Sequence, residues 1–219
     1  MHPGLSQIGL RATPASAAPH LSMELRAWKN VLRNMARITQ VLSAAEIELA
    51  RGLLREYADS LGVDLCFQNF DRELSELPGA YAPPGGRMLL AYRSSPSNKD
   101  VCLAGCGALR PLCPEICEMK RLYVRAEFRG LGIGRALAET LIAAAQEIGY
   151  RAMRLDTLPA MREAQALYVA LGFQEIAPYT HNPVCGSRFL ELAFSSSHTS
   201  EPRHEDRFPK HAELKKENK

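Results

Sequence analysis

The chain has 219 residues, of which 46% are hydrophobic and 23% charged, and its formal net charge is +3. This is the composition of an ordinary soluble globular protein, and no stretch approaches the roughly 20 apolar residues that a membrane-spanning helix needs. So small a net charge argues against a nucleic-acid-binding protein, which usually concentrates far more Lys and Arg on one face. Six cysteines do not make the dense framework of a small secreted protein, so we expect a cytoplasmic protein without a membrane partner.

The two ends of the chain differ in composition from its centre. The first 22 residues contain no acidic residue and lack the apolar core of a secretory signal, so we expect residues 1–34 to be a disordered or weakly ordered extension. The true translation start could be as late as Met23 or Met35. Residues 195–219 are Ser-rich and then mixed in charge, with few apolar residues, which predicts a disordered tail. One domain is therefore expected over residues 35–194.

The domain begins with a strand and an amphipathic helix. Residues 37–42 resemble a short strand, and the Ser-x-x-Glu pattern at residues 43–46 is a capping box, which starts a helix. Apolar residues then recur at helical spacing until Gly62 ends the helix. A short second helix is predicted over residues 71–77. The paired prolines within residues 81–86 require a loop, and loops of this kind often contact substrates.

Strands and helices alternate through the rest of the domain. Two strand-like runs, at residues 87–93 and 101–109, are joined by a polar segment and predict a hairpin. The later elements are a strand at 118–124, a glycine-rich turn, a helix over about 134–148, a strand at 151–157, a helix over about 160–171, and strands at 173–176 and 188–194. Strands before, between and after helices define an α/β class with a mixed sheet.

The glycine-rich turn, Arg129-Gly-Leu-Gly-Ile-Gly-Arg135, lies between a strand and a helix. Because glycines lack Cβ atoms, successive backbone N–H groups can turn toward one concavity, where the start of the helix favours an anion such as pyrophosphate. Arg129 and Arg135 add positive charge. The alternative interpretation is a glycine-rich turn that binds no ligand.

Two other phosphate-binding motifs compete with this interpretation. A Walker loop ends in Gly-Lys-Ser/Thr, whereas Gly134 is followed here by Arg135-Ala136, so that motif is excluded. A dinucleotide-binding fold has G-x-G-x-x-G directly after the first strand of the domain. Here the spacing is G-x-G-x-G, five residues beyond Val124, so a nucleotide-binding oxidoreductase remains only as an alternative.

Two motifs resemble those of one family. Arg129-x-x-Gly132-x-Gly134 resembles the Q/R-x-x-G-x-G/A signature of the GNAT superfamily of acetyl-CoA-dependent N-acetyltransferases, and the strand Met119-Lys-Arg-Leu-Tyr-Val124 before it is similar to the family's. Ala164-x-x-Leu167-Tyr168-x-x-x-Gly172-Phe173 resembles the family's next motif. The motifs cover about 55 residues, and the order of elements is similar to the family's over most of the domain.

The resemblance implies a fold and a cofactor. It implies a mixed, mostly antiparallel sheet of about six to seven strands, flanked by about four helices and splayed at the cofactor site. It also implies acetyl-CoA as co-substrate, without a metal, and a small-molecule or protein amine as acceptor, without nucleic acid, in a monomer or homodimer. The cofactor-binding residues that it implies are Leu122, Tyr123, Val124, Arg129, Gly130, Leu131, Gly132, Ile133, Gly134 and Arg135.

Tyr168 is the candidate general acid that the family match implies. A phenol with a pKa near 10 is protonated at neutral pH and can donate its proton to a departing thiolate. The alternative is a packing aromatic, because Ala164, Leu167, Tyr168 and Leu171 form one helical stripe. A non-catalytic acyl-CoA-binding module would keep the glycine loop without needing Tyr168.

The residues on the acceptor side are predicted with less support from the motifs. Glu118, on the strand that leads into the cofactor site, matches a position that is often acidic in the family, and we expect it to act as the base; a solvated or paired carboxylate is the alternative. Asp156 is the second choice for the base and a substrate-binding candidate, and Tyr81 is the first candidate for contacting the acceptor. Met161 stands where relatives frequently have Asn, which puts one cofactor contact in doubt.

Four cysteines raise the question of a metal. Cys102, Cys106, Cys113 and Cys117 are spaced C-x₃-C-x₆-C-x₃-C, which lacks the tight C-x₂-C knuckle of structural zinc sites. We therefore expect no metal, and small apolar thiols on one buried face of the sheet.

Overall fold

The computed structural model of the chain describes residues 36–62, 69–94 and 100–194. The two terminal segments predicted to be disordered, residues 1–34 and 195–219, lie outside the described residues. The strands are β1 (Arg37–Gln40), β2 (Arg87–Ser94), β3 (Val101–Cys113), β4 (Ile116–Val124), β5 (Ala152–Thr157), β6 (Gln174–Ile176) and β7 (Arg188–Ala193). The helices are α2 (Ala44–Leu61), α3 (Phe70–Glu76), α4 (Ile133–Ile148) and α5 (Arg162–Ala170), with 3₁₀ turns η2 (Gly79–Tyr81) and η3 (Ala126–Phe128).

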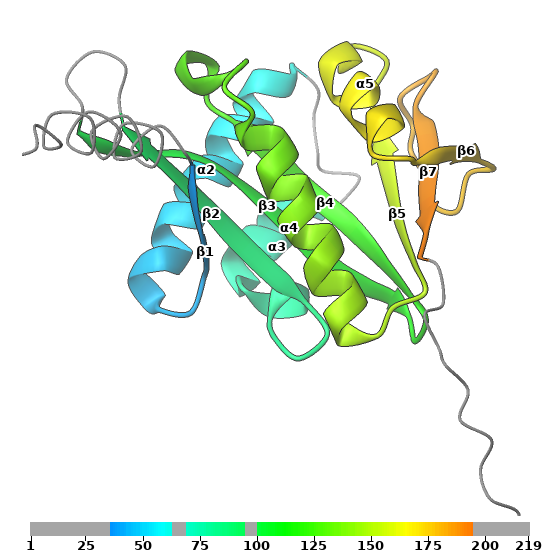
Figure 1. The fold of residues 1–219 in the computed structure, drawn as a ribbon, viewed down its shortest axis with the longest axis horizontal. Helices are drawn as coiled ribbons and strands as arrows, with labels where there is room; N and C mark the ends of the chain where they lie inside the picture. Colours follow the sequence, from blue (N-terminus) through cyan, green and yellow to red (C-terminus); the bar gives the residue numbers. More distant parts are fainter. Residues whose placement is uncertain (1–35, 63–68, 95–99, 195–219) are drawn as a thin grey trace, which may run out of the picture.

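The strands form one open sheet in the order β1-β2-β3-β4-β5-β7-β6 (Figure 1). Neighbours are antiparallel except β4 and β5, which are parallel. In the described part of the chain this is a seven-stranded sheet with four α-helices, so the predicted mixed, mostly antiparallel α/β fold is confirmed. The pairing of β4 with β5 is short: Ile116–Glu118 lie opposite Ala152–Arg154, and beyond these residues the two strands separate.

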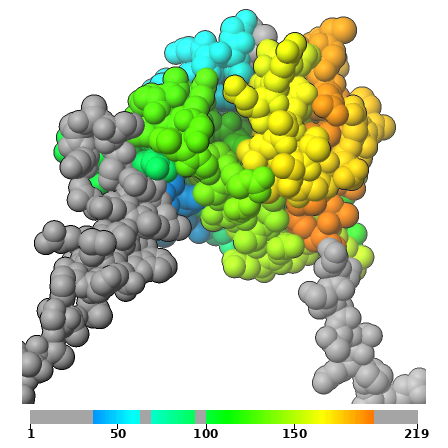
Figure 2. Space-filling view, turned by 45° about the horizontal axis from the view of Figure 1, so that its top comes forward, coloured from blue at the N-terminus to red at the C-terminus, as the bar shows by residue number. Residues whose placement is uncertain are grey.

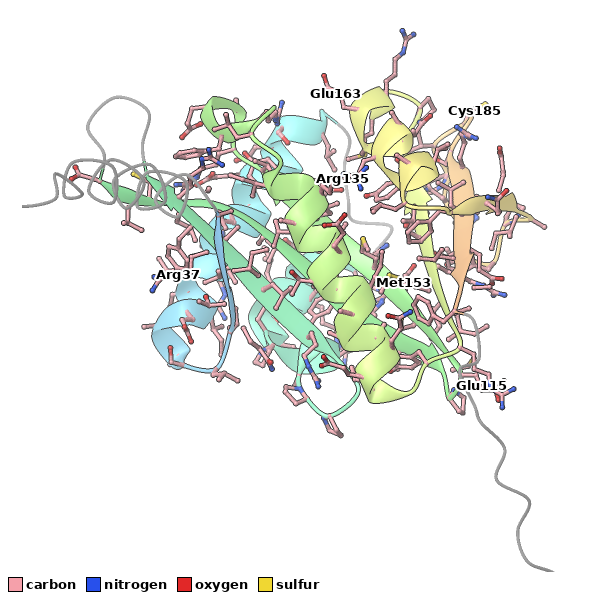
Figure 3. All side chains as sticks on the ribbon, viewed as in Figure 1. Arg37, Glu115, Arg135, Met153, Glu163 and Cys185 are labelled. Atoms are coloured by element: carbon pink, nitrogen blue, oxygen red, sulfur yellow. The ribbon has the colours of Figure 1, made fainter. Side chains whose placement is uncertain are left out.

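Helices cover the two faces of the sheet and bury a core on each. The amphipathic helix α4 packs diagonally across one face, with α5 beside it, while α2 and α3 lie on the opposite face (Figures 1 and 3). The core beneath α4 and α5 includes Phe128, Leu137, Leu141, Met153, Leu155 and Phe173. The core beneath α2 and α3 includes Leu53, Leu54, Phe70, Leu74, Met88 and Leu90. Burial of these two apolar clusters holds β4, in the middle of the sheet, in place.

The predicted capping box at the start of α2 is confirmed. Ser43 Oγ accepts a hydrogen bond from the Glu46 N–H at 3.3 Å, and Glu46 Oε2 accepts one from the Ser43 N–H at 2.9 Å. Gly62 ends the helix with φ 64°, a left-handed conformation that glycine adopts without a Cβ clash.

We expect Ser43→Ala to lower the free energy of unfolding by about 1 kcal/mol, because it removes the side-chain acceptor of the cap. Urea denaturation should show a lower midpoint with an unchanged m-value. Ser60→Ala, in the last turn of the same helix, is the matched control, because its hydroxyl is exposed and its partner among the described residues is the Tyr57 carbonyl. A Ser43→Ala midpoint no lower than that of the control would contradict the role of the cap.

The expectation that the four cysteines share one buried face is wrong. Cys106 lies in the core beneath α2 and α3, Cys117 lies in the core beneath α4, and Cys113 is exposed. Cys117 pairs with Pro111, an odd number of residues after Cys106, and so faces the other side of the sheet. A bulge in β3 moves Cys102 to that other side as well: the pairing passes from Ala91–Gly105 to Tyr92–Leu103 and leaves Ala104 as an extra residue between Cys102 and Cys106. One extra residue in a strand moves the following side chains to the other face.

Candidate active site

An irregularity in β4 shapes the centre of the site. Tyr123 pairs with Cys106 and Lys120 with Ala108, so that Gly107 lies opposite two residues, Arg121 and Leu122. Arg121 has φ 58°, in the left-handed region that non-glycine residues rarely adopt. Successive residues of a regular strand point to opposite faces, but this bulge directs the adjacent side chains of Lys120 and Arg121 to the same face, the one that carries α2 and α3.

A cavity of about 510 Å³ runs from the glycine loop to the point where β4 and β5 separate. Figure 2 shows it as a groove between the green segment that leads into α4 and the yellow α5. All the residues predicted to bind the cofactor line this cavity except Leu131, whose side chain is exposed. The apolar part of its wall includes Phe128, Ile133, Ala164 and Leu167.

The glycine loop forms the polar end of this cavity. Gly130 and Gly132 have φ of 73° and 78°, and a Cβ added to either would meet no atom within 4 Å. Gly132 is the N-cap of α4 and supplies no side-chain hydrogen bond to the first helical N–H groups. Unpaired N–H groups at a helix start and the exposed arginines Arg129 and Arg135 form a site with the chemistry of a phosphate cradle.

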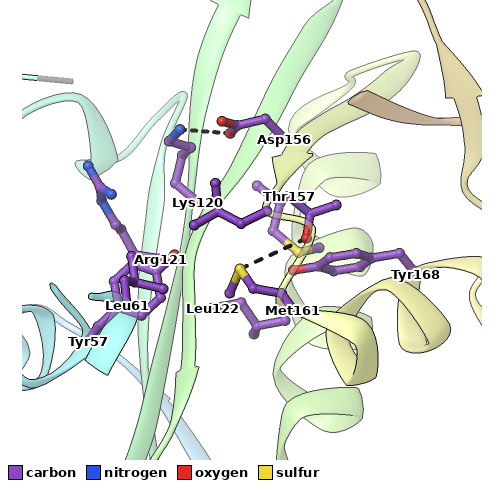
Figure 4. Close-up of a pocket in the computed structure, with 11 residues that line it drawn as sticks. Tyr57, Leu61, Lys120, Arg121, Leu122, Asp156, Thr157, Met161 and Tyr168 are labelled. Carbon is purple, nitrogen blue, oxygen red and sulfur yellow. Dashed lines mark hydrogen bonds and ion pairs between the residues drawn. The ribbon is translucent and has the colours of Figure 1, made fainter. Parts of the chain in front are cut away.

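A second, much smaller cavity of about 40 Å³ adjoins the inner end of the first (Figure 4). Five residues line both cavities: Tyr57, Leu61, Leu122, Leu158 and Met161. The remaining residues around the small cavity are Met119, Lys120, Arg121, Asp156, Thr157 and Tyr168. The structure therefore brings Tyr168 and Asp156, predicted from separate parts of the sequence, to one small space.

Tyr168 is both a packing residue and a candidate proton donor. Its ring is 6% exposed and makes an edge-on contact with Phe173 at 5.7 Å between ring centroids. Its hydroxyl points into the small cavity, toward Thr157 and Met161 (Figure 4), and has no hydrogen-bond partner among the described residues. Burial raises the pKa of Tyr168, and the nearby Tyr57 and Asp156 raise it further, so the phenol is protonated at neutral pH.

Asp156 is held by a cation and an amide. Lys120 Nζ lies 3.0 Å from Asp156 Oδ1, and Asn182 Nδ2 donates a hydrogen bond to Asp156 Oδ2 at 2.8 Å. Burial by itself raises the pKa of Asp156, but the charge and hydrogen bond of Lys120, together with Asn182, bring that pKa below its ordinary value. Asp156 is therefore a carboxylate at neutral pH.

Glu118 lies next to Lys120 but lines neither of these two cavities. It is 1% exposed, accepts hydrogen bonds from Arg110 Nε at 2.8 Å and the Tyr179 hydroxyl at 2.9 Å, and lies 3.7 Å from Lys120 Nζ. Each of its oxygens therefore has a protein partner. The assignment of Glu118 as the base stays a prediction.

Tyr81 also lies outside the small cavity. It is 2% exposed, and its hydroxyl donates to Glu73 Oε1 at 2.8 Å. Glu73 in turn binds Arg121 through two hydrogen bonds, from Nε at 2.8 Å and from Nη2 at 2.7 Å. Tyr81 faces a separate cavity of about 250 Å³ next to α3, so it reaches the candidate acceptor region only through the Glu73–Arg121 pair.

Sequence reasoning missed Tyr57, Lys120, Arg121 and Asn182. Two consecutive basic residues between the apolar residues Met119 and Leu122 were the available signal for the bulge, because a regular buried strand would point one of them into the apolar core. Asn182 belongs to the segment between β6 and β7, and no pattern in the sequence marks it.

The described residues contain neither a membrane-spanning helix nor a metal-binding cluster. None of the described helices combines the length and apolar character that a bilayer-spanning segment requires. No group of three or more His, Cys, Asp and Glu side chains in the described ranges is arranged to hold a metal ion.

An open mixed sheet that splits between two parallel strands, with a glycine loop at the start of the following helix, is the architecture of an acyltransferase fold. The family model described as the acetyltransferase (GNAT) family matches residues 54–173, which is more than half of the chain. The chain therefore belongs to the GNAT acetyltransferase family and is an acyltransferase.

Relatives and solved structures agree with this membership. An uncharacterised N-acetyltransferase of Schizosaccharomyces pombe is 38% identical over 159 residues, with 72% of this chain and 94% of the relative covered. An uncharacterised N-acetyltransferase of Escherichia coli K12 is 32% identical over 145 residues, with 65% and 82% covered. The structure of a GNAT acetyltransferase from Staphylococcus aureus Mu50 has a TM-score of 0.58 at 20% identity, with 73% and 99% covered, and this likeness shows the fold alone.

Proposed function

We propose that this enzyme transfers the acetyl group of acetyl-CoA to a primary amine by direct attack, in a ternary complex of enzyme, donor and acceptor. The observation that carries the proposal is the junction of the two cavities where β4 and β5 separate. A CoA thioester has a polyanionic end, a long flexible arm and a reactive tip. The larger cavity offers a phosphate cradle, an apolar wall and an opening toward Tyr168, in that order.

The arm of the donor has a matching surface on β4. Leu122, Tyr123 and Val124 line the larger cavity, and β5 pairs with β4 only as far as Glu118. The edge of β4 that faces β5 therefore carries backbone groups without a sheet partner beyond that point. We propose that the amide groups of the arm pair with this edge as an added strand, while the glycine loop and Arg129 hold the pyrophosphate.

The reaction then needs three groups of this chain. The amine nitrogen attacks the carbonyl carbon, the C–N bond forms, the C–S bond breaks, and the departing thiolate takes a proton from the Tyr168 hydroxyl, which regains one from water. The Val124 N–H is the first choice to stabilise the carbonyl oxygen. The attacking amine loses its proton toward Asp156, which lines the small cavity where Glu118 does not. A carboxylate with a lowered pKa is a weak base, so Asp156 orients the amine and passes the proton to water.

Saturating CoA is expected to raise the melting temperature of the wild type, since a ligand at 100 times its Kd stabilises the folded state by about 2.7 kcal/mol. Gly134→Trp should abolish this shift. Gly134 lines the larger cavity, and a Cβ there would lie 3.8 Å from both Leu167 Cδ2 and Val124 Cγ2, so an indole would fill the space between them. Thermal unfolding with and without CoA measures both results.

Gly134→Ala is the matched control, because one methyl group makes only ordinary contacts and should keep the shift. A wild type that saturating CoA does not stabilise would overturn the proposed function. A Gly134→Trp variant that folds and keeps the full shift would show that CoA binds elsewhere.

A further inference from the structure

More cationic than anionic side chains line the small cavity. Of the residues that line it, Lys120 and Arg121 are cationic and Asp156 is anionic. The bulge in β4 is what puts two neighbouring cations on one face, at the expense of a left-handed backbone at Arg121. Such a conformation is unfavourable in a non-glycine residue and persists where the surrounding structure holds it.

Hydrogen-bond donors in this cavity outnumber the free acceptors. Arg121 uses Nε and Nη2 on Glu73, while its Nη1 has no acceptor in the described part of the chain. Among the described residues, the one fully buried side-chain N or O atom without a partner is Thr39 Oγ1, so Arg121 Nη1 is not a fully buried, unpaired donor. Both oxygens of Asp156 already accept hydrogen bonds.

Lys120 has spare donors as well. An ammonium group carries three N–H bonds, and Asp156 Oδ1, at 3.0 Å, is its only hydrogen-bond acceptor among the described residues. Glu118 Oε1, at 3.7 Å, contributes charge but is too distant for a hydrogen bond. Lys120 is thus neutralised in part by neighbouring carboxylates and still carries N–H groups without an acceptor among the described residues.

We propose that the acceptor is an amino-acid-like amine, with a carboxylate close to its amino group, and that Lys120 binds this carboxylate. The inference rests on the proposed function of the same site. A carboxylate supplies acceptor oxygens for the unused N–H groups of Lys120, and hydrogen bonds between an ionised donor and an ionised acceptor are the strong ones. Arg121, which also lines the cavity, adds positive charge beside it.

The same charges select against other amines. A polyamine or a lysine-rich peptide would place a further ammonium group beside Lys120 and Arg121, and like charges in a partly dehydrated space repel. Cations near the attacking amine also favour its neutral form, which is the form that attacks. Positive charge in this position therefore serves both recognition and activation of an acidic acceptor.

The test compares matched acceptors in the full-length protein. Phenylalanine, phenylalaninamide and phenethylamine form one series, alanine, alaninamide and ethylamine a second, and spermidine is the polycationic probe. The rate of thiol release gives kcat/KM for each acceptor. Each value is calculated with the concentration of the neutral amine, because the amino groups differ in basicity. We expect the amino acid to exceed its amide and its decarboxylated amine by about tenfold or more in at least one series, with spermidine lowest.

Charge variants at Lys120 identify the binding group. Lys120→Gln should bring the ratio of kcat/KM for the acid to kcat/KM for the amide toward one. Lys120→Arg, which keeps the charge, should retain most of the preference for the acid. Arg72→Gln is the control, because this exposed arginine on α3 pairs with Glu76 and lines neither the small nor the larger cavity. The ratio of kcat/KM for the acid to kcat/KM for the amide is measured within one protein and does not depend on its active fraction. A partly unfolded variant therefore still gives a valid ratio.

Two outcomes separate this inference from the proposed function. Acetylation of amides and simple amines at rates equal to those of the acids, or faster, would overturn the inference and leave the proposed function intact. CoA binding without thiol release from any amine would overturn the proposed function. Calorimetric binding of phenylalanine and phenylalaninamide to the CoA-saturated protein then decides the inference: tighter binding of the acid supports it, and equal or absent binding overturns it.

Discussion

Tyr168→Phe is expected to lower kcat by about 10²- to 10³-fold while the KM for acetyl-CoA stays within about twofold. The change removes one oxygen atom and keeps the ring that packs against Phe173. Because the hydroxyl has no hydrogen-bond partner among the described residues, its loss leaves no protein group unsatisfied. The whole effect should therefore fall on protonation of the departing thiolate. Thiol release under saturating donor measures kcat, and the CoA-induced shift in melting temperature reports binding.

Tyr92→Phe is the matched control, because Tyr92 lies on β2 beneath Arg37 and lines neither cavity. It should leave both kcat and the CoA-induced rise in melting temperature within about twofold of the wild-type values. An unchanged kcat in Tyr168→Phe would assign this tyrosine to packing alone. Since burial raises the pKa of Tyr168, its ionisation should not reduce the wild-type rate until the pH exceeds the ordinary phenol value, near 10.

Glu73→Gln is expected to destabilise the protein by about 3–5 kcal/mol, because it leaves the Arg121 charge buried without a counterion. The two side chains are 13% and 3% exposed and form two hydrogen bonds. Urea denaturation followed by circular dichroism measures the loss. The double variant Glu73→Gln/Arg121→Met should recover most of it, since replacing both charges of a buried pair by less polar groups is often neutral.

Glu76→Gln, on the same helix, is the control: its pair with Arg72 is exposed and should contribute less than about 1 kcal/mol. If Glu73→Gln cost no more than this control, the buried pair would not stabilise the fold. Burial raises the pKa of Glu73, but Arg121 and Tyr81 bring it below its ordinary value. A carboxyl with a lower pKa in the folded state stabilises it above the unfolded pKa, near 4.3, and this contribution is lost as the pH falls through the folded pKa. Glu73→Gln should abolish that part of the acid sensitivity.

The order and type of the elements could be predicted because they depend on short-range patterns. The capping box at Ser43, helical apolar spacing and terminal glycines identified α2, α4 and α5 within a few residues of their observed bounds. The glycine loop was recognisable for the same reason, since its positive φ angles require glycine at Gly130 and Gly132. Tyr168 was predicted through its place in a motif on one helix.

The acceptor side could not be predicted in the same way. Glu118 and Asp156 both lie on strands, and no pattern in the sequence distinguishes the carboxylate that lines the small cavity from the one behind Lys120. Tyr81 sits in a Pro-Gly loop of the kind that often contacts substrates, yet its hydroxyl is engaged by Glu73. A loop composition indicates exposure on average and does not specify the partner of one side chain.

What the sequence by itself determined is the order of the elements and the glycine loop, which follow from helical periodicity and from backbone conformations that local residue types impose. Tertiary structure alone decided which side chains surround the small cavity. The bulge that turns Lys120 and Arg121 to one face is a property of the pairing between β3 and β4. The partner of Arg121 is a carboxylate 48 residues away in the chain, and that of Lys120 lies 36 residues away. Burying charges requires counterions, and only the folded arrangement of distant segments supplies them.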